Sequence, residues 1–163
     1  MQKKTDSASV FRHRITELYF DTVYRLALSR TGSKSDADDV VQEVFVRFMR
    51  TDTAFESDEH AKAWLIKVTI NCSKNVFASP WFKKTVPLSE ELTFTDTHSG
   101  DVYLTVSKLP QKYRTVIHLF YYEDMSVKQI ADLLNTKETT VKSQLHRARE
   151  MLKSMLGEDY NEL

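Results

Sequence analysis

The sequence predicts an all-α protein made of two small helical domains joined by a flexible linker, the second of which carries a helix-turn-helix. Only three glycines and three prolines occur in 163 residues, so turns are few. Apolar residues recur at steps of three and four along most of the chain, as in amphipathic helices. This periodicity fails only over residues 80–100. We therefore assign residues 1–79 to an N-terminal domain, 80–101 to a linker and 102–163 to a C-terminal domain.

Three helices are expected in the N-terminal domain. The first covers 10–30 and carries the apolar stripe Phe11, Ile15, Leu18, Tyr19, Val23 and Leu26. The second covers 36–50 and follows Ser35, whose side-chain oxygen is a good helix N-cap. The third is capped by Ser57 and ends near residue 79. One side of it carries Ala61, Trp64, Leu65, Val68 and Cys72.

The C-terminal domain is expected to begin with a short helix at 102–109 and a second at 111–122. Ser126 and Gln129 then form a capping box before a short helix that ends at Asn135, a residue that tolerates the left-handed conformation of a tight turn. A longer helix starts near Glu138. Its buried stripe is predicted to be Val141, Leu145, Ala148 and Leu152.

Charge and cysteine content limit the classes of function. Lysine plus arginine and aspartate plus glutamate both number 23, so the surface as a whole should not attract nucleic acid. The single Cys72 excludes internal disulfides and a cysteine-based zinc site, which fits a reducing cytoplasm. No apolar run approaches the roughly 20 residues of a membrane span, so no direct membrane insertion is expected.

The last predicted helix is locally basic although the whole chain is neutral. With its apolar stripe facing inward, its polar residues fall on the flanks and the far face, namely Lys142, Ser143, Gln144, His146, Arg147 and Arg149. A short helix, a tight turn and a longer basic helix form a helix-turn-helix, whose second helix enters the major groove of DNA. The alternative is a solvated face on an ordinary bundle helix.

Two stretches resemble one known family. "LPQKYRTVIHLFYYEDMSVKQIADLLNTKETTVKSQLHRAREML" resembles the C-terminal domain of bacterial RNA polymerase sigma factors, and "DADDVVQEVFVRFMR" resembles their most recognisable N-terminal helix. Their order, with "AWLIKVTINCSKNVF" between them, is similar to the extracytoplasmic-function (ECF) group. The resemblance covers roughly residues 10–156. It implies a protein that directs promoter recognition and transcription initiation.

The resemblance implies that the helix at 36–50 docks on a coiled coil of the largest subunit of core RNA polymerase. Gln42 and Glu43 occupy the positions that make polar contacts there, with Asp39, Val40 and Arg47 as neighbours. Asp36, Asp38 and Asp39 have a second interpretation, because carboxylates in the first turn stabilise a helix start. A carboxylate metal site at these three residues is a further alternative, although capping explains them well and we expect no metal or cofactor.

The segment from Phe55 to Asn75 resembles the family's reader of the minus-10 promoter element. A loop at 55–62 would capture a base flipped out of the non-template strand, and the following helix would contact the opened duplex. The residues implied are Phe55, Lys62, Lys67, Asn71, Lys74 and Asn75. Asparagine and lysine suit single strands, which offer base edges and phosphates. Trp64 is expected to be a core residue, because it shares the apolar stripe.

In the C-terminal domain, the resemblance implies that the minus-35 element is contacted by Thr140, Lys142, Ser143, Gln144, His146, Arg147 and Arg149. Thr140 and Arg149 would contact phosphates. The sequence departs from the family at Asn135, where glycine is more usual, and in lacking an arginine-rich run after the third helix. The flap region of the polymerase and a dedicated anti-sigma factor are the other partners implied.

The linker and the overall function each leave alternatives open. The linker either threads toward the RNA exit path of the polymerase or is a plain tether, and the role of Trp81 and Phe82 is not fixed by the sequence. The whole chain could instead be a stand-alone helix-turn-helix regulator, which would leave the motif at 36–50 unexplained. An enzyme is not expected, because the sequence has no glycine-rich phosphate loop and no metal-ligand spacing of histidines.

Overall fold

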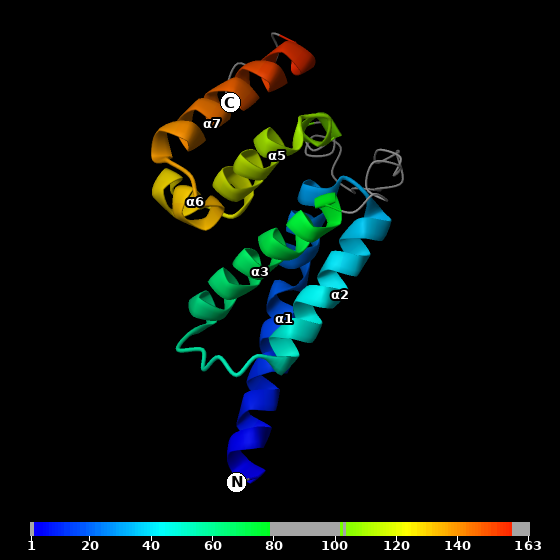
Figure 1. Ribbon diagram of the computed structural model, residues 1–163, viewed down its shortest axis with the longest axis vertical. Coiled ribbons are helices and arrows are strands. Elements are labelled where there is room, and N and C mark those ends of the chain that lie inside the picture. The colour runs from blue at the N-terminus through cyan, green and yellow to red at the C-terminus, as the bar shows by residue number, and fades with distance from the viewer. Residues whose placement is uncertain (1, 79–101, 103, 158–163) are drawn as a thin grey trace. The chain divides into compact units, whose positions relative to one another are not determined.

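The computed structural model describes residues 2–78, 102 and 104–157, and the chain divides into two compact units, Met1–Thr85 and Val86–Leu163. The described residues form helices joined by short connections, without a strand among them (Figure 1). The all-α prediction is therefore confirmed. The predicted linker at 80–101, with Trp81 and Phe82, lies outside the described residues, so the domain boundaries stay a prediction.

The N-terminal unit is a bundle of three helices, α1 (Gln2–Thr31), α2 (Lys34–Arg50) and α3 (Asp58–Ala78), each of which packs on the other two. The first turns of α1 project beyond the ends of α2 and α3 (Figure 1). The core is apolar and contains, among others, Ile15, Val23, Leu26, Val44, Phe48, Leu65 and Ile70. Burial of these side chains is the main stabilising contribution to a unit of this size.

The apolar stripe predicted for the first helix is partly wrong. Ile15, Val23 and Leu26 are fully buried, but Leu18 is 55% exposed. The helix also begins at Gln2, eight residues before the predicted start. Periodicity identifies a helix, but it does not show where along the helix the neighbouring helices stop covering it.

The corner between α1 and α2 is tighter than predicted. Gly32 has a positive φ of 68° and ends α1, and its N–H donates to the carbonyl of Leu28 at 2.8 Å. Ser33 then caps α2, with its side chain accepting a hydrogen bond from the N–H of Asp36 at 3.4 Å. The N-cap is thus Ser33 and not Ser35, because the glycine lets the chain reverse within two residues.

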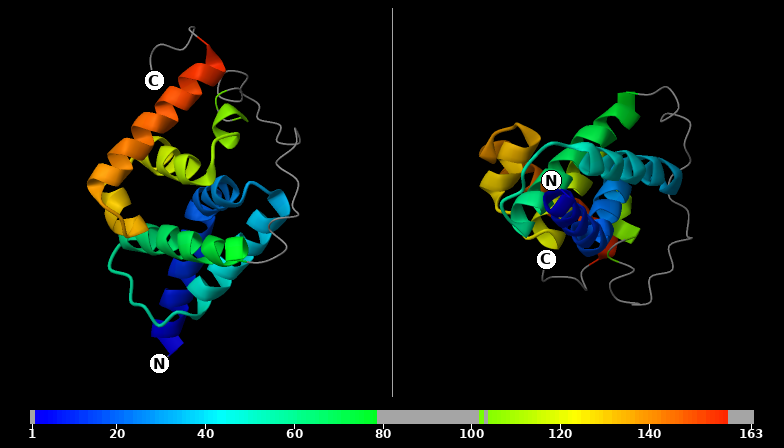
Figure 2. Two further views of the ribbon diagram at one scale, coloured as in Figure 1. Left: turned by 45° about the horizontal axis from the view of Figure 1, so that its top comes forward. Right: turned by 90° about the horizontal axis from the view of Figure 1, so that it is seen from below.

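The C-terminal unit consists of α5 (Gln111–Ile117), the π-helical turn η2 (His118–Tyr122), α6 (Val127–Leu134) and α7 (Glu138–Leu156). Residues 104–107 are also helical, within the short helix predicted at 102–109. α7 packs on both α5 and α6, and it meets α6 at a tight corner (Figure 2). The predicted stripe of α7 is confirmed in full, because Val141, Leu145, Ala148 and Leu152 are all buried.

The helix predicted at 111–122 is not a uniform α-helix. After Ile117 the chain widens into one π-helical turn, in which the N–H of Glu123 donates to the carbonyl of His118 at 3.2 Å. His118 is buried at 2% exposure, stacks on Tyr122 with ring centroids 5.3 Å apart, and lies 3.4 Å from a carboxylate oxygen of Glu123. Side-chain periodicity does not distinguish a single π-turn from an α-helix, since both present a helical face.

Candidate functional site

The outer face of α2 carries four of the five residues predicted to contact polymerase. Asp39, Gln42, Glu43 and Arg47 are exposed. The guanidinium of Arg47 donates to the Glu43 carboxylate at 2.7 Å, one helical turn away, and this hydrogen bond raises the pKa of Arg47. Glu43 therefore presents a charge that is already partly neutralised, whereas Gln42 is a neutral donor and acceptor beside it.

Val40 does not share this face. Its side chain is 2% exposed and belongs to the core, so it has almost no surface to offer a partner. This corrects the expectation that Val40 contacts polymerase. The physical reason is helical spacing, because Val40, Val44 and Phe48 recur every four residues along the buried side of α2.

The exposed α2 residues border two different grooves. A groove of about 360 Å³ lies between α2 and α3, and its lining residues are Asp39, Val40, Glu43, Arg47, Cys72, Asn75 and Val76. It brings residues predicted to contact polymerase together with Asn75, which was predicted to contact DNA. Cys72 is buried at its floor, and burial raises the pKa of the thiol.

The second groove lies between α1 and α2, was not predicted, and is more apolar. Its volume is about 590 Å³ and its lining residues are Thr16, Phe20, Tyr24, Asp38, Val41, Gln42, Phe45, Val46, Met49 and Arg50. Phe20 is 45% exposed and Met49 47% exposed. Contiguous apolar side chains left in water are typical of protein-binding surfaces. Phe20 is a large apolar residue outside the predicted apolar stripe of the first helix. Its position was the only signal in the sequence for this groove.

The connection between α2 and α3 is held by an aromatic cluster around Phe55. The Phe55 ring lies with centroid distances of 6.3 Å to Phe11, 5.4 Å to Phe48, 5.4 Å to His60 and 5.8 Å to Trp64. Aromatic pairs at such distances stabilise beyond their buried area. Phe55 is half-buried, so it anchors the connection from within. Trp64 also belongs to this cluster but is only half-buried. The prediction that Trp64 is a core residue is therefore only partly confirmed.

The helix α3 brings most of the predicted minus-10 residues together. Lys67, Asn71, Lys74 and Asn75 are exposed. Asn71 follows Lys67 by four residues, and Lys74 and Asn75 follow Asn71 by three and four, which places all of them on one face. Lys62 lies nearly half a turn away from Asn71, and its ammonium lies 5.9 Å from the centroid of the Tyr19 ring. The exposed face is therefore made of two lysines and two asparagines, and Lys62 is separate from it.

The helix-turn-helix forms as the sequence predicts. Ser126 accepts from the N–H of Gln129 at 3.1 Å, and the Gln129 side chain accepts from the N–H of Ser126 at 2.9 Å, which completes the capping box. Asn135 has a φ of 53°, in the left-handed region, and the N–H of Thr136 donates back to Ala131 at 2.9 Å. The turn is therefore closed in the manner usual for glycine.

The outer face of α7 holds the predicted minus-35 residues at different levels of exposure. Lys142, Ser143, His146 and Arg147 are exposed, while Thr140 and Gln144 are half-buried on the flanks. His146 lies 3.1 Å from the carboxylate of Glu150. Arg147 lowers the pKa of Tyr113 in α5, chiefly through a hydrogen bond to its side chain.

Arg149 is held against η2. Its Nε donates to the hydroxyl of Tyr121 at 2.7 Å, and its guanidinium carbon lies 5.5 Å from the ring centroid of Phe120 and 5.6 Å from that of Tyr121. If Arg149 contacts a phosphate, as predicted, it must do so through guanidinium nitrogens other than Nε, because Nε donates to Tyr121. Sequence spacing could not reveal the bond, because it joins residues 28 positions apart.

The alternative of a carboxylate metal site finds no support in the part of the chain that the structure describes. No group of three or more histidine, cysteine, aspartate or glutamate side chains there could hold a metal ion, and this includes the neighbourhood of Asp36, Asp38 and Asp39. Among the same residues, no helix is both long enough and apolar enough to cross a bilayer.

Comparison with known proteins matches both units to parts of one family. Residues 15–81 match the family described as Sigma-70 region 2, and residues 99–152 match Sigma-70, region 4. Two similar relatives are the ECF RNA polymerase sigma factors SigM and SigW of Bacillus subtilis (strain 168). SigM is 31% identical, with 91% of this chain and 96% of the relative covered. SigW is 28% identical, with 87% of each covered.

Solved structures share the fold. The sigma factor RpoE from Bartonella quintana, in complex with the anti-sigma factor NepR, has a TM-score of 0.66 at 21% identity over 90% of this chain and 97% of that one. CnrH, in complex with the cytosolic domain of CnrY, has a TM-score of 0.64 at 22% identity over 95% of both chains. At these identities the likeness concerns the fold alone.

Proposed function

The chain belongs to the ECF group of RNA polymerase sigma factors, and from this premise we propose which surfaces of its two units perform the steps of initiation. A sigma factor binds core RNA polymerase and directs it to promoters. The N-terminal unit is assigned polymerase docking and the minus-10 element, and the C-terminal unit the minus-35 element. The observation that carries this assignment is the match of the two units, in order, to Sigma-70 regions 2 and 4.

Polymerase docking is assigned to the exposed face of α2. Gln42 and Glu43 are the central contacts, with Asp39 and Arg47 beside them, and all four side chains are open to solvent. The apolar groove between α1 and α2 is continuous with this face, since Gln42 lines it. A coiled coil of the largest polymerase subunit would supply apolar side chains for the groove and polar ones for Gln42 and Glu43.

Minus-10 recognition is assigned to the connection at 51–57 and to the exposed face of α3. The connection would receive one flipped base, and the lysines of α3 would contact phosphates while Asn71 and Asn75 meet base edges. The half-buried Phe55 supports the connection from inside. Lys62, whose ammonium faces Tyr19, is assigned a supporting position at the edge of this surface.

Minus-35 recognition is assigned to the exposed face of α7 in the major groove. Lys142, Ser143, His146 and Arg147 form its centre and Gln144 its flank. A well-placed base contact is worth about 1–3 kcal/mol of discrimination between base pairs. Thr140 and Arg149 are assigned to phosphates, Arg149 in an orientation fixed by Tyr121.

The partners follow from the same premise. Core polymerase, including its flap region for the C-terminal unit, and promoter DNA are the working partners, in the bacterial cytoplasm where transcription occurs. An anti-sigma factor is a further partner, by analogy with the sigma factor RpoE and its anti-sigma factor NepR. RNA synthesis is left to the polymerase, so this chain is assigned no catalysis. A stand-alone regulator is disfavoured, because it leaves the match to Sigma-70 region 2 without a purpose.

Run-off transcription tests the proposal directly. Core polymerase alone and core polymerase with this chain are compared on a library of genomic fragments. We expect discrete new transcripts only with the chain, and their start sites would define both promoter elements. The Gln42→Ala/Glu43→Ala double variant should lose co-elution with core polymerase, whereas Lys34→Ala, an exposed change at the start of α2, should not. Absence of any chain-dependent transcript would refute the assignment.

A second experiment concerns the isolated chain. Neutralisation of phosphates supplies most nonspecific affinity for DNA, and this chain has a net charge of zero. We therefore expect the chain to bind duplex DNA poorly by itself and selectively only as holoenzyme. Gel-shift assays at moderate salt measure this. Sequence-specific binding by the isolated chain at nanomolar concentration would contradict it and favour the stand-alone regulator.

A further inference from the structure

Two arginines of α1 bind the two ends of the connection between α2 and α3, through partners that lie 36 to 44 residues later in the chain. We propose that Arg12 and Arg14 are positioning residues for minus-10 base capture, because they fix the shape of residues 51–57 before DNA arrives. The inference rests on the proposed function and deepens it, since it concerns how that surface distinguishes its base.

Arg12 holds the beginning of the connection. Its guanidinium donates to the backbone carbonyl of Phe48 and, at 2.8 Å, to that of Thr51, which is the residue that ends α2. The same guanidinium lies over two rings, 5.4 Å from the centroid of Phe48 and 5.8 Å from that of Phe55. One side chain thus satisfies carbonyls at the end of α2 and covers the ring that anchors the connection.

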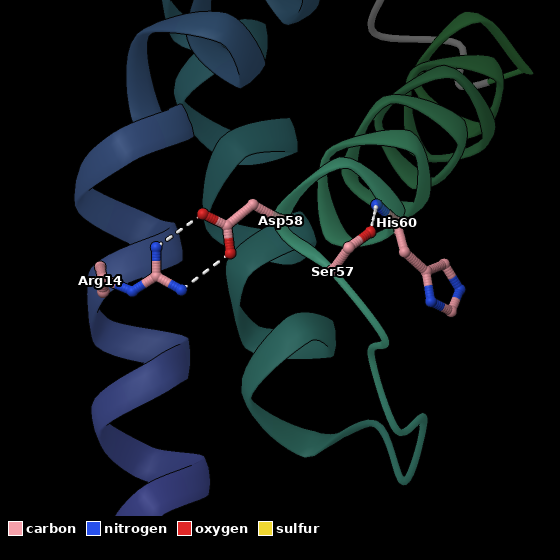
Figure 3. Close-up of polar contacts among 4 residues, drawn as sticks. All are labelled: Arg14, Ser57, Asp58 and His60. Carbon is pink, nitrogen blue, oxygen red and sulfur yellow. Dashed lines mark hydrogen bonds and ion pairs between the residues drawn. The ribbon is translucent and has the colours of Figure 1, made fainter.

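Arg14 holds the other end. Its two terminal nitrogens donate to the two carboxylate oxygens of Asp58 at 2.7 and 2.8 Å, a bidentate pair at the first residue of α3 (Figure 3). The Arg14 guanidinium also lies 5.3 Å from the ring centroid of Phe11, which in turn stacks on Phe55. Arg12 and Arg14 therefore act on the same connection through separate contacts.

Between these attachments, hydrogen bonds that involve side chains of the connection and of α3 hold the segment in place. Ser57 accepts from the N–H of His60 at 3.1 Å (Figure 3), and the N–H of Glu56 donates to Nδ1 of His60 at 3.2 Å. Thr51 and Thr53 join their hydroxyls at 2.8 Å. The exposed side chains that remain on the connection include Asp52, Ala54 and Glu56.

The arrangement matters because a base that enters a mobile loop must order it, and that cost is subtracted from binding. A connection that is already fixed at both ends avoids this cost. It also keeps its side chains in positions that favour one base over the others. The alternative is that Arg14, whose side chain is 52% exposed, binds a DNA phosphate directly. Loss of a phosphate contact weakens binding to all sequences equally, whereas loss of a positioning residue affects the choice of base.

The test uses holoenzyme and a premelted promoter template taken from the run-off experiment. Each base of the minus-10 non-template strand is replaced in turn by an abasic site. The initiation rate on the intact strand divided by that on the most sensitive abasic strand gives a capture ratio. This ratio does not depend on the fraction of active protein, so partial misfolding of a variant leaves it unchanged. We expect Arg14→Ala to lower the ratio about twofold to fivefold, the range that corresponds to an exposed ion pair.

The variants form a cycle. Asp58→Ala should match Arg14→Ala, and the double variant should be no worse than either, because both remove the same pair. Arg14→Lys should recover part of the ratio, since lysine keeps the charge but not the two-pronged geometry. Arg12→Ala should lower the ratio further. Arg25→Ala, an exposed arginine of the same helix, should leave it unchanged.

The outcomes separate this inference from the function on which it rests. If wild-type holoenzyme shows no sensitive position, base capture itself is wrong. If the wild type shows one and Arg14→Ala keeps the full ratio, the positioning role is wrong. Equal losses on intact and abasic strands, relieved at low salt, would mean that Arg14 contacts a phosphate, and this too would overturn the inference.

Discussion

The connection at 51–57 and the helix α7 are both proposed to contact DNA, but neighbouring residues hold them in place in different ways. Both are proposed to present polar side chains to DNA, and both are buttressed from a neighbouring helix. In the N-terminal unit the buttress holds the backbone, through the bonds of Arg12 to carbonyls and the packing of Phe55. In the C-terminal unit it holds only side chains, as when Tyr121 accepts from Arg149.

The difference arises because α7 has the regular backbone hydrogen bonds of a helix, whereas the connection does not. A helix satisfies its own backbone and keeps its shape, so α7 needs help only to orient long side chains. A connection without regular structure has neither advantage, and its shape must come from outside. Loss of a buttress should therefore alter stability and shape in the N-terminal unit, but only side-chain placement in the C-terminal unit.

The largest effect is expected from Phe55→Ala. Removal of this half-buried ring leaves a space beside Phe48 and Trp64, and we expect the N-terminal unit to lose about 2 kcal/mol of its free energy of unfolding. Denaturant unfolding followed by tryptophan fluorescence measures this, because Trp64 touches the ring. Tyr121→Phe, the matched loss in the C-terminal unit, should stay within about 0.5 kcal/mol. Equal costs in both units would break the comparison.

The next effect concerns the turn before α7. Asn135 has a φ of 53°, where a β-branched side chain is strained, so Asn135→Val should destabilise the C-terminal unit by about 1–2 kcal/mol. Asn135→Gly should be close to neutral, because glycine adopts this conformation freely. Thermal unfolding of both variants distinguishes the two. If Asn135→Val left the stability unchanged, the turn would change shape readily. The placement of α7 would then depend on outside contacts, as the shape of the connection does.

A smaller effect is expected in the titration of tyrosines. Arg147 holds the pKa of Tyr113 below its usual value, whereas burial raises the pKa of Tyr19 and of Tyr24 in the N-terminal unit. Ultraviolet absorbance during an alkaline titration should show Tyr113 ionising first. Arg147→Ala should move this early step to higher pH and leave the late ones in place. An unchanged early step would show that Arg147 does not contact Tyr113 of α5.

The smallest effect concerns acid. The hydrogen bonds from Arg14 lower the pKa of Asp58, so the ion pair stabilises the folded state above the ordinary pKa of aspartate, and this contribution disappears as the pH falls through the lowered value. Stability measured from about pH 5 downward should therefore fall less steeply for Arg14→Ala than for the wild type. The same slope for both would mean that the pair has no preference for the folded state.

The sequence predicted the elements of the fold better than their attachments. Periodicity located every helix of the helix-turn-helix, the capping box at Ser126 and the turn at Asn135, because these depend on residues only a few positions apart. It missed the contacts of Arg12 and Arg14, which join residues 36 to 44 positions apart. The family resemblance, in turn, included Val40 among the polymerase contacts, although its side chain is buried, because a motif transfers roles by position and takes no account of which side of the helix is buried.

The same reason explains the partial success at the site. The centre of α7 followed from helical spacing, whereas the residues on the exposed face of α3 were implied by the resemblance to sigma factors. The apolar groove beside Phe20 did not, since a sequence shows which residues are apolar but not which of them lack a neighbour. Base preference did not follow either, because a long basic side chain can contact a guanine edge or a phosphate from the same helical position.

The π-turn at His118–Tyr122 amounts to one extra residue accommodated inside a helix. Removal of one residue would let this stretch wind as an ordinary α-turn, which would leave the residues before and after it in register but move those inside it. Tyr121 lies inside the turn, so its placement against Arg149 depends on the extra residue. Evolutionary change in this part of the chain is thus expected to proceed through substitutions, while the length of the segment is conserved.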